Sequence, residues 1–163
     1  MAELEKKDIY ACSLAMPSPD EPRCDEWVAE IARHLETNKE DDIYLVGHSL
    51  GGPAILRYLE SSTARPVAGA VLVSSPSEKN ANRKIDSFLE TEFNFESILS
   101  RCSTFAVIQG DNDTSVPMSN ATFLAKELGA ELVVVENGRH LNGSAGWFQL
   151  PQCLEALKKL MGS

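Results

Sequence analysis

Short apolar runs recur along this sequence, and each is followed by a polar loop and an amphipathic helical stretch. Three of the runs, IYLV, VAGAVLV and FAVI, are almost continuously apolar, which is typical of strands that helices cover on both faces. Their alternation with helical stretches predicts a three-layer α/β fold with a mostly parallel central sheet. The predicted strands are Ile9–Leu14, Ile43–Val46, Val67–Ser74, Thr104–Gln109 and Glu131–Val135.

Helical periodicity fills most of the remaining chain. The predicted helices are Asp25–Glu36, Gly51–Glu60, Ser119–Leu128 and Pro151–Met161. The segment Ile85–Ser100 has no clean period, and we expect it to form one or two short helices over the sheet edge. Because the 163 residues contain no internal repeat and no long linker, we expect residues 1–163 to form a single α/β domain.

Charge and cysteine usage limit the classes of partner. A net charge of −9 disfavours nucleic acid and anionic membrane, because an acidic surface repels both. No run is long enough to span a bilayer, and the first ten residues are too charged for a signal peptide. Cys12, Cys24, Cys102 and Cys153 lie far apart and without metal-ligand spacing. We therefore expect free thiols, no metal and no cofactor, in a cytoplasmic protein for which the nucleus is an alternative location.

The most informative motif follows the strand IYLV and precedes a helix. It has the pattern G-x-S-x-G, running from Gly47 through Ser49 to Gly51. In such a strand-to-helix turn the serine is held in a strained conformation with its hydroxyl exposed, and the two glycines are expected to remove clashes. The backbone N–H of Leu50, at the start of the helix, is then placed to stabilise an oxyanion. The motif predicts Ser49 as a nucleophile.

A serine nucleophile needs a base, and the chain has three histidines. His48 adjoins the serine and is interpreted as a packed histidine under the turn, while His34 is interpreted as a partly buried residue of a helix. His140 lies in a glycine-containing loop directly after the strand LVVV. Because the carboxyl ends of parallel strands are where this architecture builds sites, we predict His140 as the base.

An acid should hold the histidine, and the loop after the strand TFAVIQ contains two aspartates. Aspartates in loops often bond their own backbone, a role that we assign to Asp111. Asp113 lies further into the loop, where it could reach His140, and we predict it as the acid. Glu136, at the end of the neighbouring strand, is a weaker candidate, and the choice between Asp111 and Asp113 stays open at this point.

Several of these segments together resemble a family of small serine hydrolases that includes the retinoblastoma-binding hydrolase and the bacterial YdeN-type proteins. The resemblance covers nearly the whole chain. GHSLGG is shared by many hydrolases, whereas the aspartate loop GDNDTSVP, at its short spacing from the histidine loop, is more particular to this family. The matching segments are Met16–Pro19, Gly47–Gly52, Val71–Pro76, Gly110–Pro117 and Gly138–Asn142.

The resemblance implies an α/β-hydrolase core without a large lid domain, no cofactor, and esterase-like activity on small acyl substrates. By motif, Ser49 matches the family's nucleophile, Asp113 its acid and His140 its base. Family members begin with an apolar strand, a glycine-containing turn and a helix with a tryptophan. The segment Met1–Lys7 resembles only the tail of that helix. We therefore expect the chain to lack the family's first strand, whose loop donates a second oxyanion N–H.

The sequence thus predicts a carboxylesterase-like serine hydrolase that cleaves small esters or activated amides through an acyl-enzyme. Transfer of the acyl group to an acceptor other than water would use the same residues. The alternative is a weak or inactive hydrolase-fold protein that acts by binding a protein partner. Its nearest motif is Pro22–Glu26, which resembles the retinoblastoma-pocket ligand L-x-C-x-E with proline in place of leucine. A loop followed by helix-start acids is the favoured interpretation of that segment.

Overall fold

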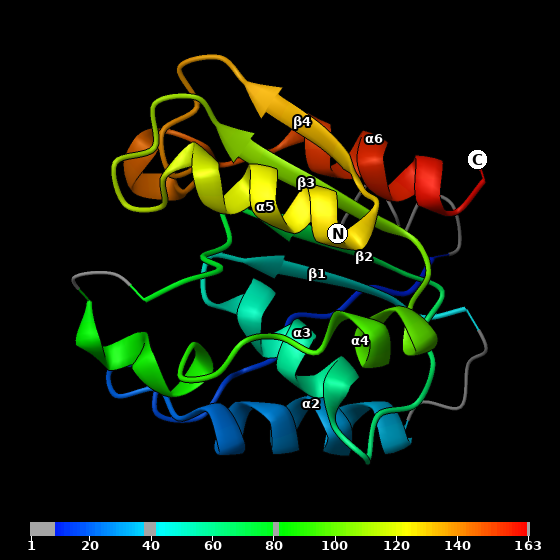
Figure 1. Cartoon of the computed structure of the whole chain (residues 1–163). Coiled ribbons are helices and arrows are strands. Elements are labelled where there is room, and N and C mark those ends of the chain that lie inside the picture. The colour runs from blue at the N-terminus through cyan, green and yellow to red at the C-terminus, as the bar shows by residue number, and fades with distance from the viewer. Residues whose placement is uncertain (1–8, 38–41, 80–81, 163) are drawn as a thin grey trace.

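A parallel four-stranded sheet forms the centre of the protein (Figure 1). The computed structural model describes residues 9–37, 42–79 and 82–162. The strands occur in the order β1-β2-β3-β4, and all adjacent pairs are parallel. Four of the five predicted strands are confirmed, as β1 (Tyr44–His48), β2 (Gly69–Val73), β3 (Phe105–Gly110) and β4 (Glu131–Val135).

The strand register brings the carboxyl ends of all four strands to one edge of the sheet. His48 lies beside Val73, and Gly110 lies beside Val135. The loops that leave these ends are the ones for which the sequence predicts chemistry. The topology therefore gathers the candidate residues at one edge, as expected for parallel α/β proteins.

Successive residues of the central strands belong alternately to two separate hydrophobic cores. In β2, Ala70 and Leu72 belong to one core, whereas Val71 and Val73 belong to the other. Successive side chains of a strand point to opposite faces, so both faces of β2 are covered, and every residue of β2 and β3 is buried. This explains why the two strands are almost continuously apolar in sequence.

Helices cover both faces and complete three layers (Figure 1). On one face, α3 (Gly51–Glu60) and α5 (Met118–Leu128) pack directly on the strands, and α2 (Cys24–Thr37) packs on α3. On the other face lies α6 (Pro151–Leu160), with Ala156 and Leu157 buried against β2 and β3. The four predicted helices are confirmed with shifts of one residue at some ends.

The segment around Ile85–Ser100 forms two short helices, as predicted, namely η1 (Arg83–Phe88) and α4 (Phe95–Arg101). Both pack against α3 rather than over the sheet edge, which corrects the predicted placement. Arg57 of α3 explains the difference. Its guanidinium donates to the carbonyl oxygens of Phe88 and Thr91 and lies 4.2 Å from the centre of the Phe93 ring, so it fastens this segment to the helix layer.

The prediction of a strand at Ile9–Leu14 is wrong. Within the described residues this segment has no regular secondary structure and pairs with no strand. A strand requires a hydrogen-bonded neighbour, and here the apolar side chains are used differently. Leu14 and Met16 pack against the hydrophobic core to which α2 and α3 contribute, and the Trp27 indole N–H donates to the carbonyl oxygen of Pro17 at 2.7 Å.

Both edges of the described sheet are partly exposed. Val46 of β1 is 49% exposed and Val134 of β4 is 51% exposed, in contrast to the buried β2 and β3. The prediction about Met1–Lys7 and a missing first strand falls outside the described residues. No helix in the described ranges has both the length and the apolar character needed to cross a membrane.

Candidate active site

Ser49 occupies the tight turn between β1 and α3. Its φ of +51° lies in the left-handed region, which a non-glycine residue adopts only under strain. Its backbone N–H donates to the carbonyl oxygen of Val73 at 2.8 Å, so the strained residue is fixed to the end of β2. The predicted strand-to-helix turn is present, and its serine is half-buried rather than fully exposed.

Glycine is needed in this turn for two different reasons. A Cβ on Gly47 would lie 2.5 Å from the carbonyl carbon of Gly51, as the sequence argument expected. A Cβ on Gly51 itself would meet nothing within 4 Å, so the expectation that Gly51 relieves a clash is wrong. Gly52 is the second constrained position, because its Cβ would collide with the Ser75 side chain. The chain can thus form this turn only because Gly47 and Gly52 have no side chain.

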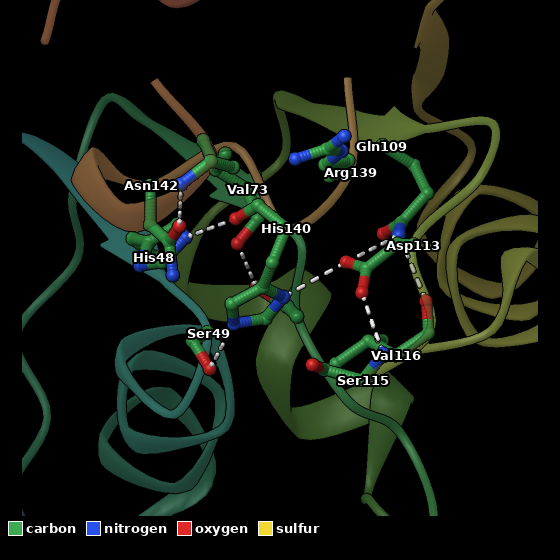
Figure 2. A network of polar contacts seen from close by, with 12 residues as sticks. His48, Ser49, Val73, Gln109, Asp113, Ser115, Val116, Arg139, His140 and Asn142 are labelled. Atoms are coloured by element: carbon green, nitrogen blue, oxygen red, sulfur yellow. Dashed lines mark hydrogen bonds and ion pairs between the residues drawn. The ribbon is translucent and has the colours of Figure 1, made fainter. Parts of the chain in front are cut away.

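His140 stands beside Ser49 although 91 residues separate them in sequence (Figure 2). Its Nε2 lies 3.1 Å from Ser49 Oγ, and its Nδ1 lies 2.8 Å from Asp113 Oδ2. The structure therefore brings together the three residues that the sequence selected. Glu136 is exposed, and it is Asp113 that contacts the histidine.

Asp113 is buried and held by several donors. Its side chain is 1% exposed, and its Oδ1 accepts the backbone N–H groups of Ser115 at 2.8 Å and Val116 at 3.0 Å. Burial raises the pKa of Asp113, but the hydrogen bonds from His140, Val116 and Ser115 outweigh it and leave the pKa below its ordinary value. The carboxylate is therefore an acceptor only, so Nδ1 of His140 carries the proton and Nε2 is free to accept one from Ser49.

Gln109 is a contributor that the sequence argument did not single out. It is the last residue before Gly110 in the buried strand β3, and it is fully buried itself. Its side-chain amide donates to Asp113 Oδ2 at 3.0 Å and to the carbonyl oxygen of Val116 at 2.9 Å. The signal in the sequence was a single polar residue at the end of an otherwise apolar strand.

Asp111 and Asn112 join the aspartate loop to the histidine loop. Asp111 Oδ1 accepts the backbone N–H of Asn137 at 2.8 Å, and Asn112 Oδ1 accepts that of Arg139 at 2.7 Å. The turn-forming role assigned to Asp111 is therefore wrong, because its carboxylate serves the neighbouring loop. The histidine loop itself is strained, with left-handed φ at Asn137, Arg139 and Leu141, and these two contacts hold it in that conformation.

His48 also differs from its predicted role. It is not packed under the turn: the residue keeps an exposed surface, while its ring lies edge-on to that of His140 with the centroids 5.0 Å apart, and its Nε2 lies 2.9 Å from the carbonyl oxygen of His140. Burial against its neighbours lowers the pKa of His48. The neutral ring can donate to that carbonyl and so supports the backbone of His140. His34 is partly buried, as expected, and lies 3.2 Å from Cys12 Sγ.

The backbone N–H of Leu50 lies at the start of α3 next to Ser49. In the described residues it donates to no acceptor. An unpaired N–H at a helix start is a suitable donor to an anion. The predicted oxyanion donor is therefore available.

Within residues 9–37, 42–79 and 82–162, no three histidine, cysteine, aspartate or glutamate side chains lie together in a way that could hold a metal ion. The Pro22–Glu26 segment forms the start of α2, with Asp25 and Glu26 in its first turn. Arg23 forms ion pairs with both acids. The segment is thus the loop and helix start that the favoured interpretation described.

Comparison with known proteins agrees with this arrangement. The family model described as "Serine hydrolase" matches residues 2–159. The chain belongs to the serine hydrolase family. The YdeN protein of Bacillus subtilis (strain 168) is 33% identical over 151 residues, which cover 91% of this chain and 79% of YdeN.

Solved structures extend the comparison to the fold. The crystal structure of the ydeN gene product from B. subtilis matches with a TM-score of 0.92 and 31% identity, covering 99% of this chain and 88% of that one. A bromoperoxidase from Bacillus anthracis matches with a TM-score of 0.67 at 15% identity, over 86% of this chain and 75% of that one. The second likeness shows a shared fold alone. This member of the serine hydrolase family therefore has an α/β-hydrolase fold, as the sequence predicted.

Proposed function

We propose that this serine hydrolase cleaves small esters or activated amides through an acyl-enzyme formed on Ser49. The observation that carries the proposal is the continuous pair of contacts from Ser49 Oγ to His140 Nε2 at 3.1 Å and from His140 Nδ1 to Asp113 Oδ2 at 2.8 Å. Serine is inert until a base takes its proton. Here the base is oriented by a carboxylate that cannot itself donate.

In the first half-reaction Ser49 Oγ attacks the acyl carbon while His140 Nε2 takes the hydroxyl proton. The negative charge that develops on the carbonyl oxygen is stabilised by the N–H of Leu50. His140 then gives its proton to the leaving group, whose bond to the acyl carbon breaks. Asp113 keeps the imidazole in the required tautomer and stabilises the imidazolium in both steps.

In the second half-reaction water takes the place of the leaving group. His140 removes a proton from the water, the resulting hydroxide attacks the acyl carbon, and Ser49 leaves with the proton that His140 returns. The acid product is released and the enzyme regains its starting state. No group from outside the protein, other than water, is needed for this cycle.

The test is labelling with a fluorophosphonate probe, with the modified peptide located by mass spectrometry. We expect rapid labelling at Ser49, because His140 Nε2 lies 3.1 Å from Ser49 Oγ and can take the serine proton. Ser49→Ala should abolish labelling, and Ser100→Ala, which changes an exposed serine on α4, should not. Rapid labelling at another residue, or full ester hydrolysis by Ser49→Ala, would overturn the proposal.

A further inference from the structure

A pocket of about 430 Å³ lies beside His140, between the loop that follows β3 and the loop that follows β4. Apart from His140, Arg139 and Ala145, its lining consists of hydroxyl and carboxamide residues. These are Asn112, Thr114, Ser115, Asn142 and Ser144. Such a lining suits a polar group rather than an alkyl chain.

Arg139 gives this pocket its charge. It is the one lining residue with a permanent charge, and no aspartate or glutamate lines the pocket. Arg139 is exposed, and within the described residues its guanidinium forms no ion pair. The Asp113 carboxylate is 1% exposed and its Oδ2 is held by His140, so it offers no exposed acceptor to the Arg139 guanidinium.

The backbone of Arg139 is fixed in this position. Its N–H donates to Asn112 Oδ1, its φ of +52° is left-handed, and its carbonyl oxygen packs so closely against Gly110 that a Cβ there would lie 2.1 Å away. The loop therefore holds a strained arginine directly before His140. A strained non-glycine residue at a site is a sign of a functional constraint.

The pocket adjoins His140 but not Ser49. In acyl transfer the histidine gives its proton to the leaving group, so the leaving group must lie on the histidine side of the serine. Because His140 lines the pocket, the residue that protonates the leaving group also borders this pocket. One guanidinium matches a single carboxylate, to which arginine can donate two parallel hydrogen bonds.

We propose that this pocket binds the leaving group of the substrate and that Arg139 pairs with a carboxylate on it. The substrate class is then an ester whose alcohol part is a hydroxy acid. The inference rests on the proposed function. In the step concerned, the bond from Ser49 Oγ to the acyl carbon forms, the bond from that carbon to the leaving oxygen breaks, and the His140 proton makes the leaving oxygen a hydroxyl.

The test compares three esters with the full chain. The substrates are 4-acetoxybenzoate, with a carboxylate on the leaving group, 4-acetoxybenzamide, its neutral counterpart, and phenyl hydrogen adipate, with a carboxylate on the acyl side. We expect kcat/KM to favour the benzoate over the benzamide, after correction for their spontaneous hydrolysis. The preference should weaken as salt is added, because an exposed charge pair is screened.

Substitutions test whether Arg139 causes the preference for the benzoate ester. Arg139→Gln should lower the ratio of kcat/KM for benzoate over benzamide by about tenfold, and Arg139→Lys should restore part of it. Lys126→Gln, which removes the same charge from an exposed side chain on α5, should leave the ratio unchanged. An unchanged ratio in Arg139→Gln overturns the proposal, as does a larger loss on phenyl hydrogen adipate than on the benzoate.

A binding measurement separates this proposal from the proposed function. In Ser49→Ala, calorimetry should detect tighter binding of 4-hydroxybenzoate than of 4-hydroxybenzamide, and Arg139→Gln in that background should remove the difference. If no ester is hydrolysed but this binding difference is found, the catalytic proposal fails, while carboxylate binding by Arg139 in the pocket is supported. If hydrolysis proceeds through Ser49 without the difference, the pocket proposal fails alone.

Discussion

The two halves of the site are positioned by different physical means. Ser49 is placed by steric fit, because the turn closes only where Gly47 and Gly52 leave room for backbone and for Ser75. Asp113 and His140 are placed by hydrogen bonds between loops that follow β3 and β4. The position of Ser49 thus depends on glycines that lack a Cβ, whereas the positions of Asp113 and His140 depend on paired hydrogen-bond donors and acceptors.

The sheet accounts for part of this difference. β1, which carries Ser49, is an edge strand of the described sheet with partly exposed residues, whereas β3, which carries Gln109 and leads to Asp113, is buried throughout. At the buried end of β3 the side-chain N–H groups of Gln109 are paired with Asp113 and Val116, whereas its Oε1 has no partner among the described residues. The acid–histidine half is therefore held by hydrogen bonds between its residues, and the serine half by local backbone geometry.

The largest expected effect comes from Asp113→Asn. The amide cannot hold His140 in the required tautomer, so kcat should fall about 10⁴-fold, measured with a chromogenic acetyl ester.

The same substitution should also make the free energy of unfolding less sensitive to acid. The folded-state pKa of Asp113 lies below its ordinary value of 3.8, so its contribution is present above that value and is lost as pH falls through the folded-state pKa.

Urea unfolding at a series of pH values below 5 measures that second effect. The free energy of unfolding of Asp113→Asn should fall less steeply in acid than that of the unaltered chain. Asp20→Asn, at an exposed carboxyl, is the control and should keep the original slope. Equal slopes in all three proteins would contradict the hydrogen-bonded carboxylate described here.

Steric placement is tested by a pair of glycine substitutions. Gly47→Ala puts a Cβ 2.5 Å from the backbone of Gly51, and we expect a loss of roughly 3 kcal/mol or more in the free energy of unfolding, together with loss of Ser49 labelling. Gly51→Ala meets open space at the start of α3 and should stay within about 0.5 kcal/mol. Similar losses in both variants would show that the turn is not closed by the Gly47 contact.

The sequence was sufficient for the parts of the molecule that follow a local pattern. Strands covered on both faces are continuously apolar, and a serine in a tight turn needs glycine close by, so β2, β3 and Ser49 could be predicted. The Ile9–Leu14 strand failed because an apolar run does not reveal whether a hydrogen-bonding partner exists. Asp111 was interpreted as a turn former or an alternative acid, and Asn112 was assigned no role, because their partners lie in another loop at separations that carry no period. Gln109 was missed because its side-chain partners are set by how the following loop folds back on β3.

The smallest of these effects should come from Gln109→Met, which keeps the volume but removes the donors to Asp113 and Val116. Unpairing the buried carbonyl of Val116 should cost about 1–3 kcal/mol in the free energy of unfolding. If the polar half depends on mutual support, Asp113 shifts and kcat also falls about ten- to a hundredfold, with KM nearly unchanged. Gln149→Met, at an exposed position, is the matched control. A loss of stability with an unchanged kcat would mean that Gln109 serves the core alone, and that Ser115, Val116 and His140 suffice to hold the carboxylate.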